Sequence, residues 1–109
     1  SVTGRIVAVN ARGVTGLDVA GVDAAVTPLE VLLAATAPTI QMAIGFGLKS
    51  TAPTFTWSTG VVELYDASPS ANYEEAASYR VGAGAENYTY QMVPNATLLT
   101  GVLAVAAFK

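Results

Sequence analysis

Large apolar residues occupy every second position of TIQMAIGFGL, residues 39–48, and between them lie Gln41, Ala43, Gly45 and Gly47. Alternation with a period of two is typical of a β-strand that has one face in a hydrophobic core. The face built from Ala43, Gly45 and Gly47 carries almost no side chain, and such a face lets another backbone approach closely. We therefore expect the large residues to fill the core. The small face should meet a close neighbour, which is either a strand of the same domain or a second subunit.

Similar short segments recur along the chain, separated by Gly, Pro and Asn. About seven or eight such segments, with turn residues near every tenth position, are typical of an antiparallel sandwich or small barrel. The sequence predicts one all-β domain over residues 1–109, of jelly-roll or immunoglobulin-like type, with at most one short helix. Besides residues 39–48, the expected strands are residues 5–10, 54–58, 61–65, 77–82, 86–92 and 98–109.

The segment TPLEVLLAATAP, residues 27–38, breaks the β pattern. Thr27 and Glu30 have the spacing of a capping box, and Pro28 falls at a first helical position. These signals predict a short helix from Pro28 to about Ala35, which Pro38 ends. A buried strand over residues 30–35 is the alternative, because a run this short is ambiguous.

The N-terminal residues 1–26 are punctuated by Gly and are difficult to place in a sandwich built from the rest. We expect them to form either an edge strand or an extended arm that packs on a neighbouring subunit. Adding a strand to a sheet edge would satisfy unpaired backbone groups there. Ile6 and Val7 are the candidate contact residues of this segment.

A polar stretch, DASPSANYEEA at residues 66–76, predicts a loop. Tyr73 lies within it and is the expected exposed aromatic, so it is a further candidate contact residue. Asp66, Ser68, Asn72 and Glu74 offer oxygen ligands, but they lack the spacing and the Gly of a calcium loop. A plain polar hairpin loop is the favoured interpretation.

The composition argues for a protein whose surface is covered by neighbours. Apolar residues make up 52% of the 109 residues and charged residues only 12%, about half the usual share of a soluble domain. So few charges give a lone monomer little protection against association. The net charge is −3 and the five basic residues are scattered, which excludes the clustered phosphate contacts that nucleic-acid binding requires. The most apolar stretches, residues 31–37 and 98–108, are too short to span a membrane, so neither nucleic acid nor membrane is an expected partner.

The chain has neither His nor Cys, which removes the common general base, the common nucleophile and the usual zinc ligands. Eight carboxylates remain, but a 109-residue sandwich with short loops leaves little room for a cleft between two of them. We therefore expect no enzyme activity, no catalytic residue, no cofactor and no metal. Asn87 and Asn95 each begin a glycosylation sequon, for which unmodified strand and turn residues are the simpler interpretation.

The segment from Thr54 to Val105 resembles the small β-sandwich virion proteins of tailed bacteriophages. The similarity is one of pattern: a strand with aromatic and Thr residues, a loop, a Gly-containing turn and a closing apolar strand. It implies a structural role in the virion, as a capsid decoration protein or an accessory subunit of the head, tail or fibre. The implied partners are further copies of the chain and a major capsid or other virion protein. It carries over no functional residue.

A second class of function fits the same sequence: a carbohydrate- or surface-binding sandwich module, or an extracellular filament subunit. Such a binding module should be monomeric and should show a sugar-dependent change in Trp57 fluorescence. An assembly subunit should form oligomers or bind a large shell.

The absence of His and Cys generates a first prediction. Because only scattered oxygen ligands are available, an excess of EDTA should leave the melting temperature unchanged. Thermal denaturation followed by circular dichroism checks this. A marked drop in the melting temperature with chelator, reversed by added Ca²⁺, would show that a metal stabilises the fold.

Overall fold

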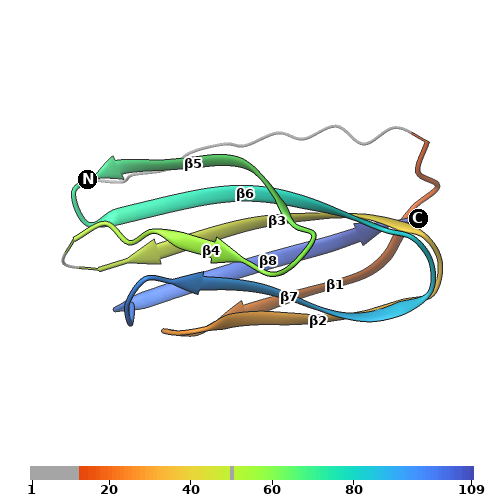
Figure 1. Cartoon of the computed structure of the whole chain (residues 1–109), viewed down its shortest axis with the longest axis horizontal. Coiled ribbons are helices and arrows are strands. Elements are labelled where there is room, and N and C mark those ends of the chain that lie inside the picture. Colours follow the sequence, from red (N-terminus) through yellow and green to blue (C-terminus); the bar gives the residue numbers. More distant parts are fainter. Residues whose placement is uncertain (1–12, 50) are drawn as a thin grey trace.

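The computed structural model describes residues 13–49 and 51–109, which form eight β-strands in two antiparallel sheets packed face to face (Figure 1). The larger sheet has the strand order β1-β8-β3-β6-β5, and the smaller sheet has the order β2-β7-β4. We call the face of each sheet that points toward the other sheet its inner face, and the opposite face its outer face. The strands are β1 (Leu17–Ala24), β2 (Leu29–Ala35), β3 (Thr39–Leu48), β4 (Phe55–Trp57), β5 (Val62–Ser70), β6 (Tyr73–Gly82), β7 (Glu86–Pro94) and β8 (Thr100–Phe108).

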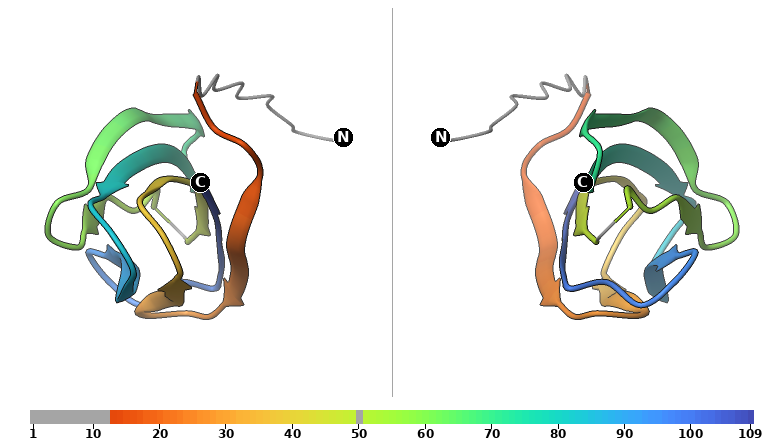
Figure 2. Two further views of the ribbon diagram at one scale, coloured as in Figure 1. Left: turned by 90° about the vertical axis from the view of Figure 1, so that its right-hand side faces the viewer. Right: turned by 90° about the vertical axis from the view of Figure 1, so that its left-hand side faces the viewer.

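Views along the strands show the larger sheet curving around the smaller one (Figure 2). β3 lies at the centre of the larger sheet, paired with β6 on one side and β8 on the other. No helix occurs in the described ranges. The predicted all-β antiparallel sandwich is therefore confirmed.

The expected helix from Pro28 to Ala35 is wrong, and the alternative of a strand is correct. Leu29–Ala35 forms β2, which pairs with β7 along its full length. Leu29, Val31 and Leu33 alternate with exposed residues and point into the core. Glu30 does not cap a helix, because its carboxylate accepts a hydrogen bond from Gln91 at 2.6 Å. Long-range pairing with β7 outweighs the local helix signals here.

The orientation of β3 is the reverse of the expected one. Gln41, Ala43, Gly45 and Gly47 are buried on the inner face, whereas the large apolar residues of this strand point outward. The reason is steric. A Cβ atom added to Gly45 would lie 2.1 Å from the Sδ atom of Met92 on the smaller sheet. The close neighbour of the small face is thus the opposite sheet of the same domain.

The core is filled mainly from the smaller sheet and from β8. Leu29, Leu33, Tyr90, Met92 and Leu103 are each fully buried. The Tyr90 hydroxyl makes a 2.7 Å hydrogen bond with the Ser78 hydroxyl, so burial of this polar atom costs little. The large residues of one sheet therefore lie against the small residues of the other.

One further expectation needs correction, and one of the alternatives left open for the N-terminal segment agrees with the structure over Leu17–Ala24. The polar stretch from Asp66 to Ala76 is not a loop: most of it belongs to β5 and β6, joined by a turn at Ala71 and Asn72. At the N-terminal end, β1 is an edge strand paired with β8 of the same chain rather than part of an arm that leaves the body. The candidate contacts Ile6 and Val7 lie outside the described residues.

The contact between Gly45 and Met92 generates a second prediction. Gly45→Ala should lower the free energy of unfolding by about 1–3 kcal/mol, because Met92 is buried and has little room to move aside. Chemical denaturation measures this change. Gly84→Ala is the matched control, since a Cβ there meets nothing within 4 Å, and it should change stability by less than about 0.5 kcal/mol. Equal stability of the two variants would contradict the proposed steric match.

Candidate protein interface

The outer face of the larger sheet is apolar over most of its area. Val22, Ile44 and Val102 expose 70%, 51% and 37% of their surface there, on three adjacent strands. Val62 and Val81 expose further apolar surface on β5 and β6. Single exposed apolar residues are ordinary, but a contiguous apolar patch marks an interaction surface.

The charged side chains of the larger sheet are engaged elsewhere. Asp18 accepts hydrogen bonds from Thr36, and Asp23 accepts one from the backbone of Glu30, so both lie against the end or edge of the smaller sheet. The others also turn toward the inner face, as their partners show: Glu63 with Trp57, Arg80 with Glu86, and Asp66 with Glu74. Among residues 13–49 and 51–109, this leaves Glu75 as the single charged side chain on the outer face of the larger sheet.

Glu75 contributes little charge to that surface. It exposes only 8% of its area, and its two carboxylate oxygens accept hydrogen bonds of 3.1 Å from the Tyr65 and Tyr73 hydroxyls. The Tyr73 ring also lies on Phe46, with a centroid distance of 4.4 Å. Two hydroxyl donors thus cover the carboxylate and replace its water.

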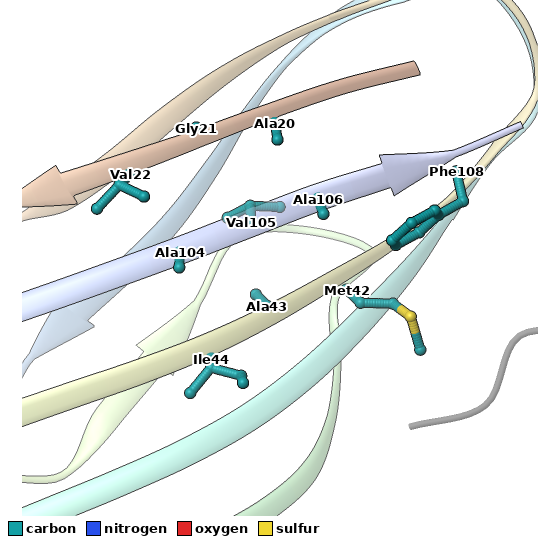
Figure 3. A pocket seen from close by; sticks show the side chains of 10 residues that line it. All are labelled: Ala20, Gly21, Val22, Met42, Ala43, Ile44, Ala104, Val105, Ala106 and Phe108. Carbon is teal, nitrogen blue, oxygen red and sulfur yellow. The ribbon is translucent and has the colours of Figure 1, made fainter. Parts of the chain in front are cut away.

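A trough runs along β8 on the outer face (Figure 3). Its volume is about 650 Å³. Ala20, Ala104 and Ala106 are too short to fill the space between Val22 on β1 and Ile44 and Met42 on β3. The trough is lined by apolar residues only: Ala20, Val22, Met42, Ile44, Ala104, Ala106 and Phe108 on the outer face, with Gly21, Ala43 and Val105 at the inward positions between them.

The outer face of the smaller sheet is different. Glu30 lies opposite Gln91 and is hydrogen-bonded to it, and Asn87 and Thr89 continue the polar row along β7. Leu32 is an isolated exposed apolar residue in these polar surroundings, with an exposed fraction of 67%. The two outer faces of the sandwich therefore have opposite character, and the apolar one is the candidate interface.

A polar cluster lies between the two sheets around Arg80. Its guanidinium donates two hydrogen bonds to Glu86, at 2.6 and 3.2 Å, and lies 3.5 Å from the centroid of the Tyr88 ring. It also donates to the fully buried Gln41. The hydrogen bonds and charge of Arg80 lower the pKa of Glu86, so the pair remains ionised. Every strong donor here has a partner in the same chain, so the cluster serves the fold rather than a ligand.

Two carboxyl groups meet where β5 pairs with β6. Burial, a hydrogen bond with Glu74 and the charges of Glu74 and Glu63 raise the pKa of Asp66 to about 7. Glu74 also accepts a hydrogen bond from Ser68. Within the described part of the chain, no three acidic side chains form a group suited to hold a metal ion. Because Asp66 holds its proton more tightly in the folded chain, this edge of the sheet is more stable at acidic pH than at pH 8.

The structure separates the sequence-predicted contact residues. Ala43, Gly45 and Gly47 contact the smaller sheet inside the domain, so the interpretation of their face as a contact between subunits is wrong. Tyr73 is half-buried in β6 but does lie on the outer face, next to Phe46. Sequence reasoning missed the outward position of Ile44 and Met42. The sequence did contain a signal for this orientation. The segments that form β2 and β7 carry enough large apolar residues to fill the core, which leaves little room there for the large residues of β3.

The raised pKa of Asp66 generates a third prediction. The folded state holds this proton more tightly than the unfolded chain, so its stabilising contribution is present below pH 4 and is lost as the pH rises to about 7. Asp66→Asn should therefore raise stability relative to the wild type more at pH 8 than at pH 4. After allowance for solvent screening at this exposed edge, we expect a gain of about 1 kcal/mol.

Melting temperatures at the two pH values measure this effect. Asp23→Asn is the control, because it removes a carboxylate from β1 at the opposite edge of the same sheet. The same pH-dependent gain in both variants would argue against a raised pKa of Asp66.

No protein-family model, curated protein or solved structure matches this chain. Across the described ranges, no helix is long and apolar enough to cross a membrane.

Proposed function

We propose that the chain is a structural subunit that acts through protein–protein assembly, as a decoration or accessory protein of a virion. The observation that carries the proposal is the apolar outer face of the larger sheet, on which Glu75 is the single charged side chain among the described residues. Such a surface offers burial of apolar area to a partner, and burial of apolar area is the main favourable term in protein association. Among residues 13–49 and 51–109, the one carboxylate on this face, Glu75, already accepts hydrogen bonds from Tyr65 and Tyr73.

The distribution of polar groups supports the same function. The charged side chains of the larger sheet turn toward the inner face or the edges, and the carboxylate of Glu75 is covered by two tyrosines. Partner-facing surfaces of stable assemblies are depleted of charge in this way at their centre. We name a virion as the assembly because residues 54–105 resemble the small β-sandwich virion proteins of tailed bacteriophages.

Two measurements generate the fourth prediction. Sedimentation velocity over about two orders of magnitude in concentration should show a transition to a larger species. Mass spectrometry of density-banded particles, prepared from the cells that encode the chain, should detect its peptides as a stoichiometric component. A chain that stays monomeric, is absent from particles and changes its Trp57 fluorescence with added oligosaccharide would instead be a carbohydrate-binding module.

A further inference from the structure

We propose that the outer face of the larger sheet binds the same face of a second copy of the chain, with β3 of each copy seated in the trough of the other. This inference rests on the proposed function, because it names a second copy of the chain as the partner that binds the apolar face. The interface would be isologous, so that each contact occurs twice across a two-fold axis.

The area of the face suits this partner. Because the larger sheet curves around the smaller one, the contact is centred on β1, β8 and β3, which line the trough (Figure 2). Three strands spaced about 4.8 Å apart, each of about nine residues that rise about 3.4 Å, cover about 440 Å². A standard stable interface removes about 800 Å² from each partner, and smaller interfaces are typical of weaker association. The face therefore suits a dimer that dissociates on dilution, with side chains interdigitating as in the core of a sandwich.

The shape of the outer face is self-complementary, because a raised row of side chains on β3 lies beside a depression along β8. Ile44 is the register partner of Ala104, and Met42 is the partner of Ala106, so a ridge and the floor of the trough lie side by side (Figure 3). A two-fold axis parallel to the strands and between β3 and β8 exchanges the positions of these two strands. Ile44 and Met42 of one copy then lie over Ala104 and Ala106 of the other.

The electrostatics of the face disfavour a polar or charged partner. A polar or charged surface would lose its water without gaining a hydrogen bond there, which costs free energy. A membrane surface is held by basic residues beside the apolar ones, and no basic side chain of the described strands points to this face. The second copy brings the same apolar face, whose one charged side chain among the described residues, Glu75, is 8% exposed.

The test uses the full chain and the substitution Ile44→Lys. Ile44 is half exposed in the monomer, so the fold should survive, as far-UV circular dichroism will show. In the dimer the substitution buries two lysines, and we expect the dissociation constant from sedimentation equilibrium to rise about 100-fold or more. Val22→Lys, on the other wall of the trough, should act in the same direction. Leu32→Lys is the matched control on the outer face of the smaller sheet and should leave dimerisation unchanged.

Cross-linking locates the contact directly. The natural chain has no Cys, so Ala104→Cys and Leu32→Cys each introduce a unique thiol. Stacked sheets lie about 10 Å apart, which is too far for a disulfide but within reach of a short bis-maleimide. Covalent dimer should form with Ala104→Cys and not with Leu32→Cys.

The outcomes separate this inference from the proposed function. If Ile44→Lys and Val22→Lys assemble as well as the wild type, the face is not the contact, although the chain is still an assembly subunit. A wild-type chain that is monomeric in solution but present in particles also overturns the pairing of two copies and leaves the structural role intact. A chain that is monomeric and absent from particles overturns both.

Discussion

The fold depends on a steric match between the two sheets. Large side chains on the smaller sheet, above all Met92 and Phe55, reach the backbone of β3 where Gly45 and Gly47 stand. Dispersion and apolar burial then act between the two inner faces. Because the inner positions of β3 are small, its large residues are left for the outer face. The apolar outer surface is thus a direct consequence of how the core is packed.

This dependence explains which parts of the fold were predictable from the sequence. Period-two alternation identified the strand at residues 39–48, and the turn spacing identified an antiparallel sandwich. Alternation alone does not say which face is buried when one face is large and the other small, because the answer depends on the opposing sheet. The helix predicted near residues 29–35 was wrong for a related reason. Its local capping signals were overruled by pairing with β7, which no local pattern records.

The unequal widths of the two sheets explain why polar residues occur on the inner face of the larger sheet. Five strands face only three, so the inner face of β5 extends past the apolar core and can carry Glu63 and Asp66. A polar stretch in the sequence therefore became a strand at the edge of the sheet rather than a loop. The alternation of Tyr65 and Ala67 with Asp66 and Ser68 has the period of a β-strand. This period was difficult to recognise in the sequence, because the positions that face inward are polar.

The apolar sequences of β3 and β8 also affect how the unfolded chain associates. Neither β3 nor β8 contains a charged residue or a proline, so each is the kind of segment that stacks into cross-β fibrils when it is exposed. Lys49 follows β3 directly, and Lys109 follows β8 directly, which places two of the five basic residues of the chain at these ends. A charge beside an unavoidable apolar strand disfavours stacking of identical chains in register, since each added chain brings the same charge close to the last. A positive charge at the end of each of these two strands therefore disfavours their in-register stacking in the unfolded chain.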